Sequence, residues 1–482
     1  MSHSQKALFI IFGGTGDLAY RKLYPALYKL YTNNFLSDHF AVIGTARREW
    51  TDEYYQEIIL DSIDSIKKDD KDAKKFASHF RYQSHNVKDT DNYHTLRERI
   101  EELDTEYKID GNRIFYLSMS PTLFGTITSH LKDQKLVSDN GFNRVIIEKP
   151  FGTNFRDSNL LNNHILKSFD EEQIYRIDHY LGKDMIQTIL PLKFGNPAFS
   201  HLWNKEHISN MQVTLAEDIG VEERGGYYDN SGALRDMVQN HILQIVSLLY
   251  MDEPSSNNAD NIALKKVEAL KNLKPITKDN IDDSFVRAQY THTDTDANIL
   301  DYLSEENVKD ASTTETFVAG KIESTAAIWE GVPIYIRTGK RMKAKETRID
   351  IVFKDKTSSL YQNEELNKNI LTIHIGPEQG VSLKLNNKVI GYNFDLVSST
   401  LTYDVSGNIP DDYEKLILNA LQGNKSSFVY WEEVAYSWKY IDTIRQLWDE
   451  TDSPLYLYPA DTNGPREASA LLGEQGHCWV WS

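Results

Sequence analysis

Two residues that lie far apart in the sequence are suited to acid–base chemistry. Asp178 stands in the run Arg-Ile-Asp-His-Tyr-Leu-Gly-Lys (176–183), and His241 ends the run Gly-Ala-Leu-Arg-Asp-Met-Val-Gln-Asn-His (232–241). A carboxylate beside an imidazole favours the imidazolium that forms when the imidazole accepts a proton, so such a pair can act as a general base. Helical spacing also places His241 on an apolar face, so a core histidine is the default interpretation of the pattern by itself.

The run that contains Asp178 also offers groups that could bind a phosphate. We expect a strand here, in which side chains alternate, so that Asp178 and Tyr180 share one face and His179 takes the other. Near the end of this strand, His179, Tyr180 and Lys183 could converge on a phosphate group. A salt-bridge cluster at the strand end is the alternative interpretation.

A second candidate lies after the apolar run Val145–Ile147, where Glu148, Lys149 and Pro150 follow. This position is the carboxyl end of an expected parallel strand, and ligands of α/β proteins gather at such ends. Lys149 could bond a substrate hydroxyl, and Pro150 is a candidate for a cis peptide bond that shapes the turn.

A glycine-rich run between an apolar strand and a helical pattern predicts a dinucleotide-binding turn. Gly13 permits the tight turn, Gly16 lets the backbone approach a pyrophosphate, and Ala19 allows close packing of helix on strand. The helix N-terminus supplies N–H groups to the phosphates. A purely structural turn is the alternative. The predicted cofactor-binding residues of this turn are Gly13, Gly14, Thr15, Gly16, Asp17 and Leu18.

The end of the second expected strand bears on the choice of cofactor. A site specific for NAD usually carries an acidic residue there, which bonds the ribose 2′-hydroxyl. Here the strand ends in Gly44-Thr45-Ala46-Arg47-Arg48. Arg47 and Arg48 suit a 2′-phosphate and predict NADP, with NAD as a second cofactor, although ordinary surface arginines are the alternative.

The pattern of elements predicts two domains. Up to about residue 180, short apolar runs alternate with helical stretches, which is typical of an α/β doubly wound parallel sheet of the Rossmann type. After residue 180 the expected strands alternate in polarity and few helices separate them, apart from a strong helix over about 232–251. We therefore expect residues 1–180 to bind the dinucleotide and residues 181–482 to form a larger α+β domain with a predominantly antiparallel sheet.

Composition narrows the classes of partner. The formal net charge is −18, from 71 acidic and 53 basic residues, which disfavours binding to nucleic acid or to anionic membranes. No apolar run approaches the roughly 20 residues that cross a bilayer, and the first six residues do not resemble a secretory signal, so we expect a cytoplasmic protein. An anionic ligand would need a local basic pocket.

No metal site is predicted. The lone Cys478 cannot form an intrachain disulfide, and its position favours a packing residue at the chain end over a reactive thiol. No set of Cys and His residues has the spacing of a zinc site. Asp294, Asp296 and Asn298 mimic a calcium loop, but Ile299 stands where that loop needs glycine.

Five runs together resemble the glucose-6-phosphate dehydrogenase family. They span nearly the whole chain in the family's order, and the stretch Asp-His-Tyr-Leu-Gly-Lys is the most specific of them. The runs are 13–19, 148–152, 176–183, 232–241 and Val-Pro-Ile-Tyr-Ile-Arg-Thr-Gly-Lys-Arg-Met over 332–342.

The resemblance implies a reaction and a role for each candidate. His241 would take the proton of the C1 hydroxyl of glucose 6-phosphate while the C1 hydride passes to NADP, giving 6-phosphogluconolactone, the first step of the oxidative pentose phosphate pathway. Asp178 would orient His241, and His179, Tyr180 and Lys183 would hold the phosphate. Lys22 would help to order the site near Lys149, which would also contact the cofactor, and a homodimer is expected. The residues that would bind the sugar or lie close to it are Lys149, Glu217, Asp236, Lys340 and Lys345, with a place nearer the phosphate as the alternative for Lys345.

The sequence departs from the family at one point, and two other classes remain. Gly376 stands where the family tends to place a polar side chain near the sugar, so Gln379 is the candidate to replace that contact. An NADP-dependent sugar oxidoreductase of the glucose–fructose oxidoreductase type also combines a Rossmann domain with a Glu-Lys-Pro turn. A non-catalytic NADP-sensing protein is the alternative from a different functional class.

Overall fold

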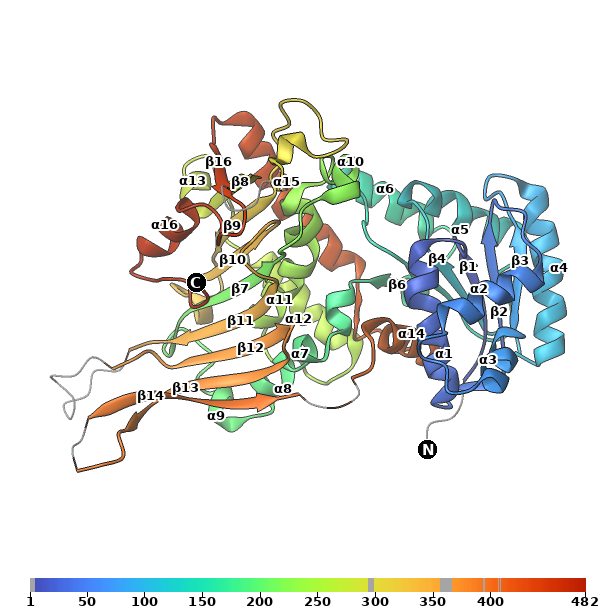
Figure 1. The fold of residues 1–482 in the computed structure, drawn as a ribbon, viewed down its shortest axis with the longest axis horizontal. Helices are drawn as coiled ribbons and strands as arrows, with labels where there is room; N and C mark the ends of the chain where they lie inside the picture. The colour runs from blue at the N-terminus through green and yellow to red at the C-terminus, as the bar shows by residue number, and fades with distance from the viewer. Residues whose placement is uncertain (1–4, 294–298, 356–365, 393–394, 406, 408) are drawn as a thin grey trace. The chain divides into compact units, whose positions relative to one another are not determined.

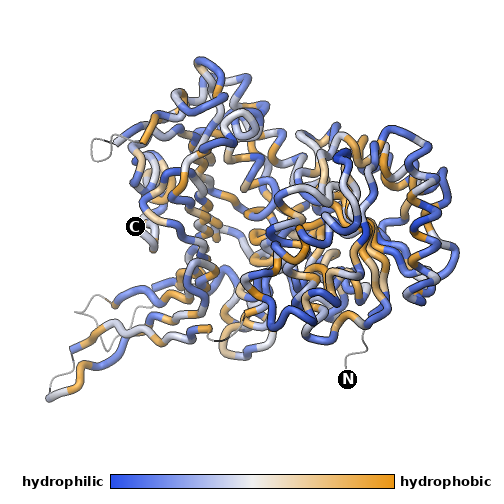
Figure 2. The backbone as a smooth tube through the Cα atoms, turned by 45° about the vertical axis from the view of Figure 1, so that its right-hand side comes forward, coloured by the Kyte–Doolittle hydropathy of each residue, from blue (hydrophilic) through white to orange (hydrophobic). Residues whose placement is uncertain are grey.

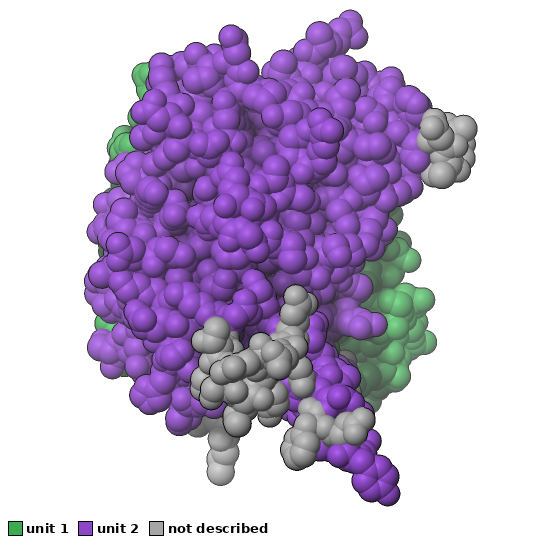
Figure 3. All heavy atoms as spheres, turned by 90° about the vertical axis from the view of Figure 1, so that its left-hand side faces the viewer, with its two compact units in different colours: residues 1–182, 256–263, 409–435 green, residues 183–255, 264–408, 436–482 purple. Residues whose placement is uncertain are grey.

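The computed structural model describes residues 5–293, 299–355, 366–392, 395–405, 407 and 409–482. The calcium-like run at 294–298 therefore lies outside the described residues. Two compact units make up the chain and are described separately (Figure 3). The predicted division into 1–180 and 181–482 stays a prediction, and the units differ from it because two later segments join the first. Unit 1 comprises Met1–Gly182, Ser256–Ala263 and Ile409–Ala435; unit 2 comprises Lys183–Ser255, Leu264–Asn408 and Tyr436–Ser482.

Unit 1 is built on a parallel sheet with the strand order β15-β6-β5-β4-β1-β2-β3, in which β15 alone is antiparallel to its neighbour among the described strands (Figure 1). The predicted Rossmann-type fold is confirmed. Residues 7–12 are at most 2% exposed. Helices cover both faces of such a parallel sheet, which explains why this strand is a continuous apolar run. The strands of the sheet are largely orange, that is hydrophobic, in Figure 2. The strands are β1 (Gln5–Phe12), β2 (Leu36–Ala46), β3 (Phe80–Ser84), β4 (Arg113–Leu117), β5 (Asn143–Ile147), β6 (Ile174–Ile177) and β15 (Phe428–Val429).

Most helices of unit 1 begin at side-chain caps that the sequence supplies, whereas α1 and α5 begin without one. Thr51 accepts a hydrogen bond from the N–H of Tyr54 at 3.2 Å, and Asp69 accepts one from Asp72 at 2.9 Å. Helix α14 comes from late in the chain, and its buried Leu416 and Leu421 belong to the core of unit 1. The helices are α1 (Tyr24–Thr32), α2 (Asp52–Ser62), α3 (Asp70–Ala77), α4 (Thr90–Tyr107), α5 (Phe124–Asp133), α6 (Phe155–Ile165) and α14 (Asp412–Gln422).

Unit 2 contains a sheet with the strand order β14-β13-β12-β11-β7-β10-β9-β8-β16. Among its described strands, the pairs β7–β10 and β8–β16 are parallel and the other pairs antiparallel, which confirms the predicted type of sheet. Strands β13 and β14 extend outward as a hairpin (Figure 1). The strands are β7 (Ile208–Ala216), β8 (Phe285–Thr291), β9 (Phe317–Ile322), β10 (Ile334–Gly339), β11 (Glu346–Phe353), β12 (Ile370–Gly376), β13 (Gly380–Lys388), β14 (Leu396–Asp404) and β16 (Leu455–Pro459).

The strong helix predicted over about 232–251 has two parts. Leu234–Ile242 is π-helical, and α11 (Leu243–Tyr250) continues it as an α-helix whose residues are all buried. Such wide turns inside helices occur frequently at functional sites. The other helices with residues in unit 2 are α7 (Asp184–Gln187), α8 (Ile189–Phe194), α9 (Pro197–Ser200), α10 (Gly225–Tyr228), α12 (Ala259–Lys271), α13 (Ile281–Ser284), α15 (Trp431–Glu450) and α16 (Glu467–Gly473).

A buried lysine binds the C-terminal end of α11. The Nζ of Lys193 donates to the main-chain oxygens of Leu249, at 2.7 Å, and of Met251. The indole N–H groups of Trp203 and Trp329 donate to the oxygens of Leu249 and Tyr250, at 3.2 and 2.7 Å. Buried helix ends need such donors because their last carbonyls have no intrahelical partner. Burial lowers the pKa of Lys193 to about 7.

Within the described residues, every helix is too short or too polar to cross a membrane.

The first prediction concerns the stability of this helix end. We expect Lys193→Met to lower the free energy of unfolding by about 1–3 kcal/mol, because buried carbonyls lose their donor. The pKa of Lys193 is about 7 in the folded chain against the usual 10.5, so the unfolded chain binds more protons between these values. The free energy of unfolding of the wild type should therefore rise as pH rises from about 7 towards 10. The difference in free energy of unfolding between the wild type and Lys193→Met, which lacks this group, should widen over the same range.

Urea unfolding at several pH values measures this difference. Lys205→Met is the matched control. Lys205 forms an ion pair with the largely exposed Glu330 at 2.9 Å, and such surface pairs contribute about 0–1 kcal/mol to the free energy of unfolding. A gap between the wild type and Lys193→Met that narrows with rising pH would contradict the prediction.

Candidate active site

The glycine-rich turn follows β1 and requires glycine at its first position. Gly13 has a φ of +94°, and a Cβ there would lie 2.2 Å from the main-chain oxygen of Ser118. The N–H groups of Gly13 and Gly14 donate to the main-chain oxygen of Thr45, at 2.8 and 3.0 Å. A Cβ on Gly14 would lie 2.9 Å from the Cα of Gly44, so the turn is pressed against the end of β2. This close packing fits the turn expected for a dinucleotide.

The rest of the turn leads into a helix. Gly16 donates its N–H to the main-chain oxygen of Gly13 at 2.9 Å, and Ala19, fully buried, begins a short π-helical segment that ends at Leu23. Asp17 is exposed and pairs with Arg21 at 2.6 Å. The first N–H groups of a helix have no intrahelical acceptor, and Thr15, Asp17 and Leu18 are the residues that would present them to phosphates.

Arg47 and Arg48 are exposed and come directly after β2. The guanidinium of Arg48 lies 5.5 Å from the ring centroid of Trp50, and its main-chain oxygen accepts a hydrogen bond from the hydroxyl of Tyr82 at 2.7 Å. Two cations therefore stand at the carboxyl end of the strand against which the glycine turn packs.

The structure corrects the predicted strand around Asp178. Strand β6 ends at Ile177, and His179–Gly182 form a 3₁₀ turn, so Asp178 and Tyr180 do not alternate on a strand face. The physical reason is local: the carboxylate of Asp178 accepts the N–H of Tyr180 at 3.0 Å, which turns the chain. The rings of His179 and Tyr180 are adjacent, with centroids 4.9 Å apart.

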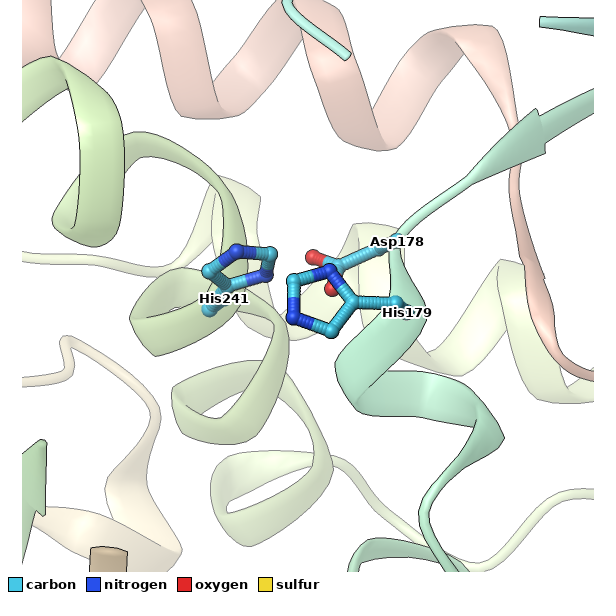
Figure 4. Close-up of side chains that lie close together, drawn as sticks. All are labelled: Asp178, His179 and His241. Atoms are coloured by element: carbon cyan, nitrogen blue, oxygen red, sulfur yellow. The ribbon is translucent and has the colours of Figure 1, made fainter. Parts of the chain in front are cut away.

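Asp178, His179 and His241 are brought together. Each offers one polar atom, and these atoms all lie within 4.8 Å of one another. Figure 4 shows His241 on its helix with its ring towards the side chains of Asp178 and His179, which come from the turn after β6. Asp178 and His241 are 2% and 1% exposed, so both groups are shielded from water. Such a group can exchange protons, and it is also a donor set that a transition metal accepts.

The sequence predicts no role for Glu148, which is a buried titratable residue in the run 148–152. Its carboxylate accepts a hydrogen bond from the hydroxyl of Tyr116. Burial raises the pKa of Glu148 to about 7, while the hydroxyl of Tyr116, the charge of Lys149 and the hydroxyl of Tyr413 oppose that shift. The Lys149–Pro150 bond, which the sequence left open, is cis. No local pattern reveals the contact with Tyr413, because that residue comes from a distant segment.

The remaining candidates are placed as follows. Lys340 and Glu217 form an ion pair at 2.7 Å, at the ends of β10 and β7. Asp236 is half-buried on the same helix as His241, and Lys345 is exposed just before β11. Lys183 precedes α7.

Two further expectations concern Lys22 and Gly376. Lys22 pairs with Asp411, the cap of α14, at 3.0 Å. A Cβ on Gly376 would meet no atom within 4 Å among the described residues. Gln379 follows in the turn before β13, and its Oε1 is buried without a hydrogen-bond partner there. Its predicted contact with the sugar stays a prediction.

Two family models together cover most of the chain. Residues 10–188 match the model described as glucose-6-phosphate dehydrogenase, NAD binding domain. Residues 190–480 match the model described as glucose-6-phosphate dehydrogenase, C-terminal domain. A nicotinamide cofactor is therefore the ligand class of the N-terminal part.

Relatives with similar sequences align with this chain over nearly its full length. The glucose-6-phosphate 1-dehydrogenase of Streptococcus pneumoniae is 48% identical, over 99% of this chain and 97% of the relative. That of Bacillus subtilis is 44% identical, over 98% of each chain. Among solved structures, a glucose-6-phosphate dehydrogenase in complex with its substrate glucose-6-phosphate has a TM-score of 0.93 at 33% identity, covering 100% of this chain and 99% of the other.

The fold alone is shared more widely. An aldose–aldose oxidoreductase from Caulobacter crescentus has a TM-score of 0.51 at 11% identity, over 92% of this chain and 98% of the other. The full-length relatives and both family models agree on a narrower group: this chain belongs to the glucose-6-phosphate dehydrogenase family.

Proposed function

We propose that this protein oxidises the C1 hydroxyl of glucose 6-phosphate to 6-phosphogluconolactone and reduces NADP. The observation that carries the proposal is the close grouping of Asp178, His179 and His241, in a chain whose N-terminal part matches a nicotinamide-binding domain. A non-catalytic sensor of NADP would not need a shielded carboxylate and imidazole within reach of each other.

His241 acts as the general base. Its imidazole takes the proton from the C1 hydroxyl, and the carboxylate of Asp178 stabilises the resulting imidazolium and fixes the orientation of the ring. Burial of both groups strengthens this electrostatic interaction because little water competes with it. When bound, the nicotinamide supplies the acceptor for the hydride that leaves C1.

Anionic and hydroxyl groups of the substrate are recognised by separate side chains. His179, Tyr180 and Lys183 bind the phosphate, and the adjacent rings of the first two support a shared location. Lys149, Glu217, Asp236 and Lys340 bind sugar hydroxyls, with Lys345 near them. The ion pair of Glu217 with Lys340 supports this assignment, since paired groups offer an acceptor and a donor at one place.

NADP is bound by the glycine turn, by Lys149 and by the two arginines after β2. Gly13, Gly14, Thr15, Gly16, Asp17 and Leu18 hold the pyrophosphate, and Arg47 and Arg48 hold the 2′-phosphate. NAD is accepted more weakly, because a hydroxyl leaves these guanidinium groups without their anion. No metal takes part in the reaction.

We further propose a cytoplasmic homodimer that opens the oxidative pentose phosphate pathway. Strand β14 lies at the edge of its sheet, and Leu401 and Tyr403 on it are 61% and 67% exposed. An exposed edge strand with apolar side chains is suited to contact a second copy.

The first test of function compares two substrates. With NADP, absorbance at the NADPH band should rise rapidly with glucose 6-phosphate and far more slowly with glucose at equal concentration, since glucose lacks the phosphate. Dialysis against EDTA should leave the rate unchanged. Absence of reduction would refute the assignment, equal rates would remove the phosphate site, and loss of rate with EDTA would favour a metal at Asp178, His179 and His241.

The catalytic base is tested by His241→Asn. We expect kcat to fall by at least ~10² while KM for glucose 6-phosphate changes little, because the lost imidazole acts on the proton that is transferred in the transition state. His79→Asn is the matched control, since His79 is also buried and its Nδ1 is hydrogen-bonded at 2.7 Å to the main chain. A kcat near that of the wild type would make His241 a core residue.

The cofactor preference is tested by Arg47→Ala. Steady-state kinetics with each cofactor should give a KM for NADP that rises by at least ~10-fold and a KM for NAD that changes by less than about twofold, because a charge-assisted contact is lost only with the 2′-phosphate. Arg466→Ala removes another highly exposed arginine and should change neither KM. An equal rise for both cofactors would exclude a 2′-phosphate role.

A further inference from the structure

The helical segment that carries His241 begins without a cap of its own. Its N-cap position is Ala233, and no side chain of that residue can accept a hydrogen bond from the helix. The preceding Gly232 is also without a side chain. The first N–H groups of a helix have no intrahelical acceptor, and here they are buried, so another element must supply one.

Glu315, in the loop before β9, supplies these acceptors. Its Oε1 accepts the N–H of Leu234 at 3.0 Å, and its main-chain oxygen accepts the N–H of Ala233 at 2.9 Å. The residue is fully buried, at 0% exposed. One residue from a distant segment therefore holds two successive N–H groups at the start of this helix.

The backbone before the helix packs closely against the carboxylate of Glu315. Gly232 has a φ of +72°, in the left-handed region that favours glycine. A Cβ there would lie 2.4 Å from Oε1 and 2.8 Å from Cδ of Glu315. The chain can approach the carboxylate this closely only because position 232 has no side chain.

The buried charge of Glu315 is balanced on its other side. Arg445 of α15 places a guanidinium nitrogen 3.3 Å from Oε2 and also pairs with Asp449 at 3.6 Å. A carboxylate at a helix N-terminus is further favoured by the helix dipole. Both carboxylate oxygens of Glu315 therefore have partners: Oε1 contacts Leu234 of the helix, and Oε2 contacts Arg445 of α15.

We propose that Glu315 is a positioning residue for the proposed dehydrogenation. By holding the N–H of Leu234, its carboxylate fixes where the segment Leu234–Ile242 begins, and with it the position of His241. This inference rests on the proposed function only for its effect on kcat.

The position of His241 is sensitive to such a change because the segment is π-helical. A π-helix packs its turns differently from an α-helix, and release of its first turn allows the segment to shift register or tighten. A displacement of about 1 Å at a general base can reduce the rate by as much as ~10². Glu315 is fully buried, so we expect its effect to appear in kcat and to leave KM nearly unchanged.

Two conservative variants separate the hydrogen bond from the charge. Glu315→Gln keeps the length of the side chain and an amide oxygen for Leu234, but loses the charge that faces Arg445. Glu315→Asp keeps the charge but shortens the reach. We expect the aspartate variant to lose at least ~10-fold in kcat with KM values within about twofold, and the glutamine variant to keep kcat within about threefold.

Glu433→Asp is the matched control. Glu433 is also 0% exposed and accepts a backbone N–H, that of Tyr430 at 3.2 Å, at the start of α15. The same shortening there should lower the thermal midpoint but leave kcat within about twofold. If Glu315 were only an ion-pair partner of Arg445, the glutamine variant would be the more damaged of the two, and that result would overturn the proposal.

Hydrogen exchange gives a readout that needs no activity. In the unliganded protein, amides over 234–242 should exchange at least ~10-fold faster in Glu315→Asp than in the wild type, and at a near-wild-type rate in Glu315→Gln. Unchanged exchange in the aspartate variant would refute the positioning role. Absence of dehydrogenase activity in the wild type would refute the proposed function and leave the exchange experiment decisive for Glu315.

Discussion

The central constraint on this structure is that the helical segment from Leu234 to Tyr250 is buried at both ends. Buried N–H and C=O groups must be paired, because each unpaired group costs about 1–3 kcal/mol. Glu315 meets this demand at the N-terminal end and Lys193 at the C-terminal end. The segment that carries His241, the proposed general base, is thereby held at both ends by residues that lie outside the segment itself.

A second constraint acts where β1 and β2 end. Thr45 accepts two N–H groups of the glycine turn, and Gly14 and Gly44 allow the backbones to approach. This packing ties the turn to the strand after which Arg47 and Arg48 follow. The two features that point to a dinucleotide with a 2′-phosphate are therefore parts of one local arrangement, although about thirty residues of sequence separate them.

The sequence predicted those parts of the fold that depend on local patterns. Apolar runs gave the strands of the parallel sheet, and Gly13 marked the tight turn. Two features were out of reach because they depend on distant segments: α14 and β15 join unit 1 from beyond residue 409, and the hydrogen bond between Glu148 and Tyr413 comes from the same late segment. The strand predicted through Tyr180 failed for a local reason, since Asp178 competes for the backbone N–H groups.

The same distinction explains which site residues the sequence reveals. His241 and Asp178 stand in dense motifs, whereas Glu315 stands in an ordinary polar loop where a charge predicts solvent exposure. Its burial is explained by two residues that the structure places beside it: Gly232, which leaves room for the carboxylate, and Arg445, whose guanidinium pairs with it. The motifs thus indicate the candidate reacting atoms, but the charged groups that we propose hold them in place are set by tertiary packing, and their position in the sequence carries no signal of that role.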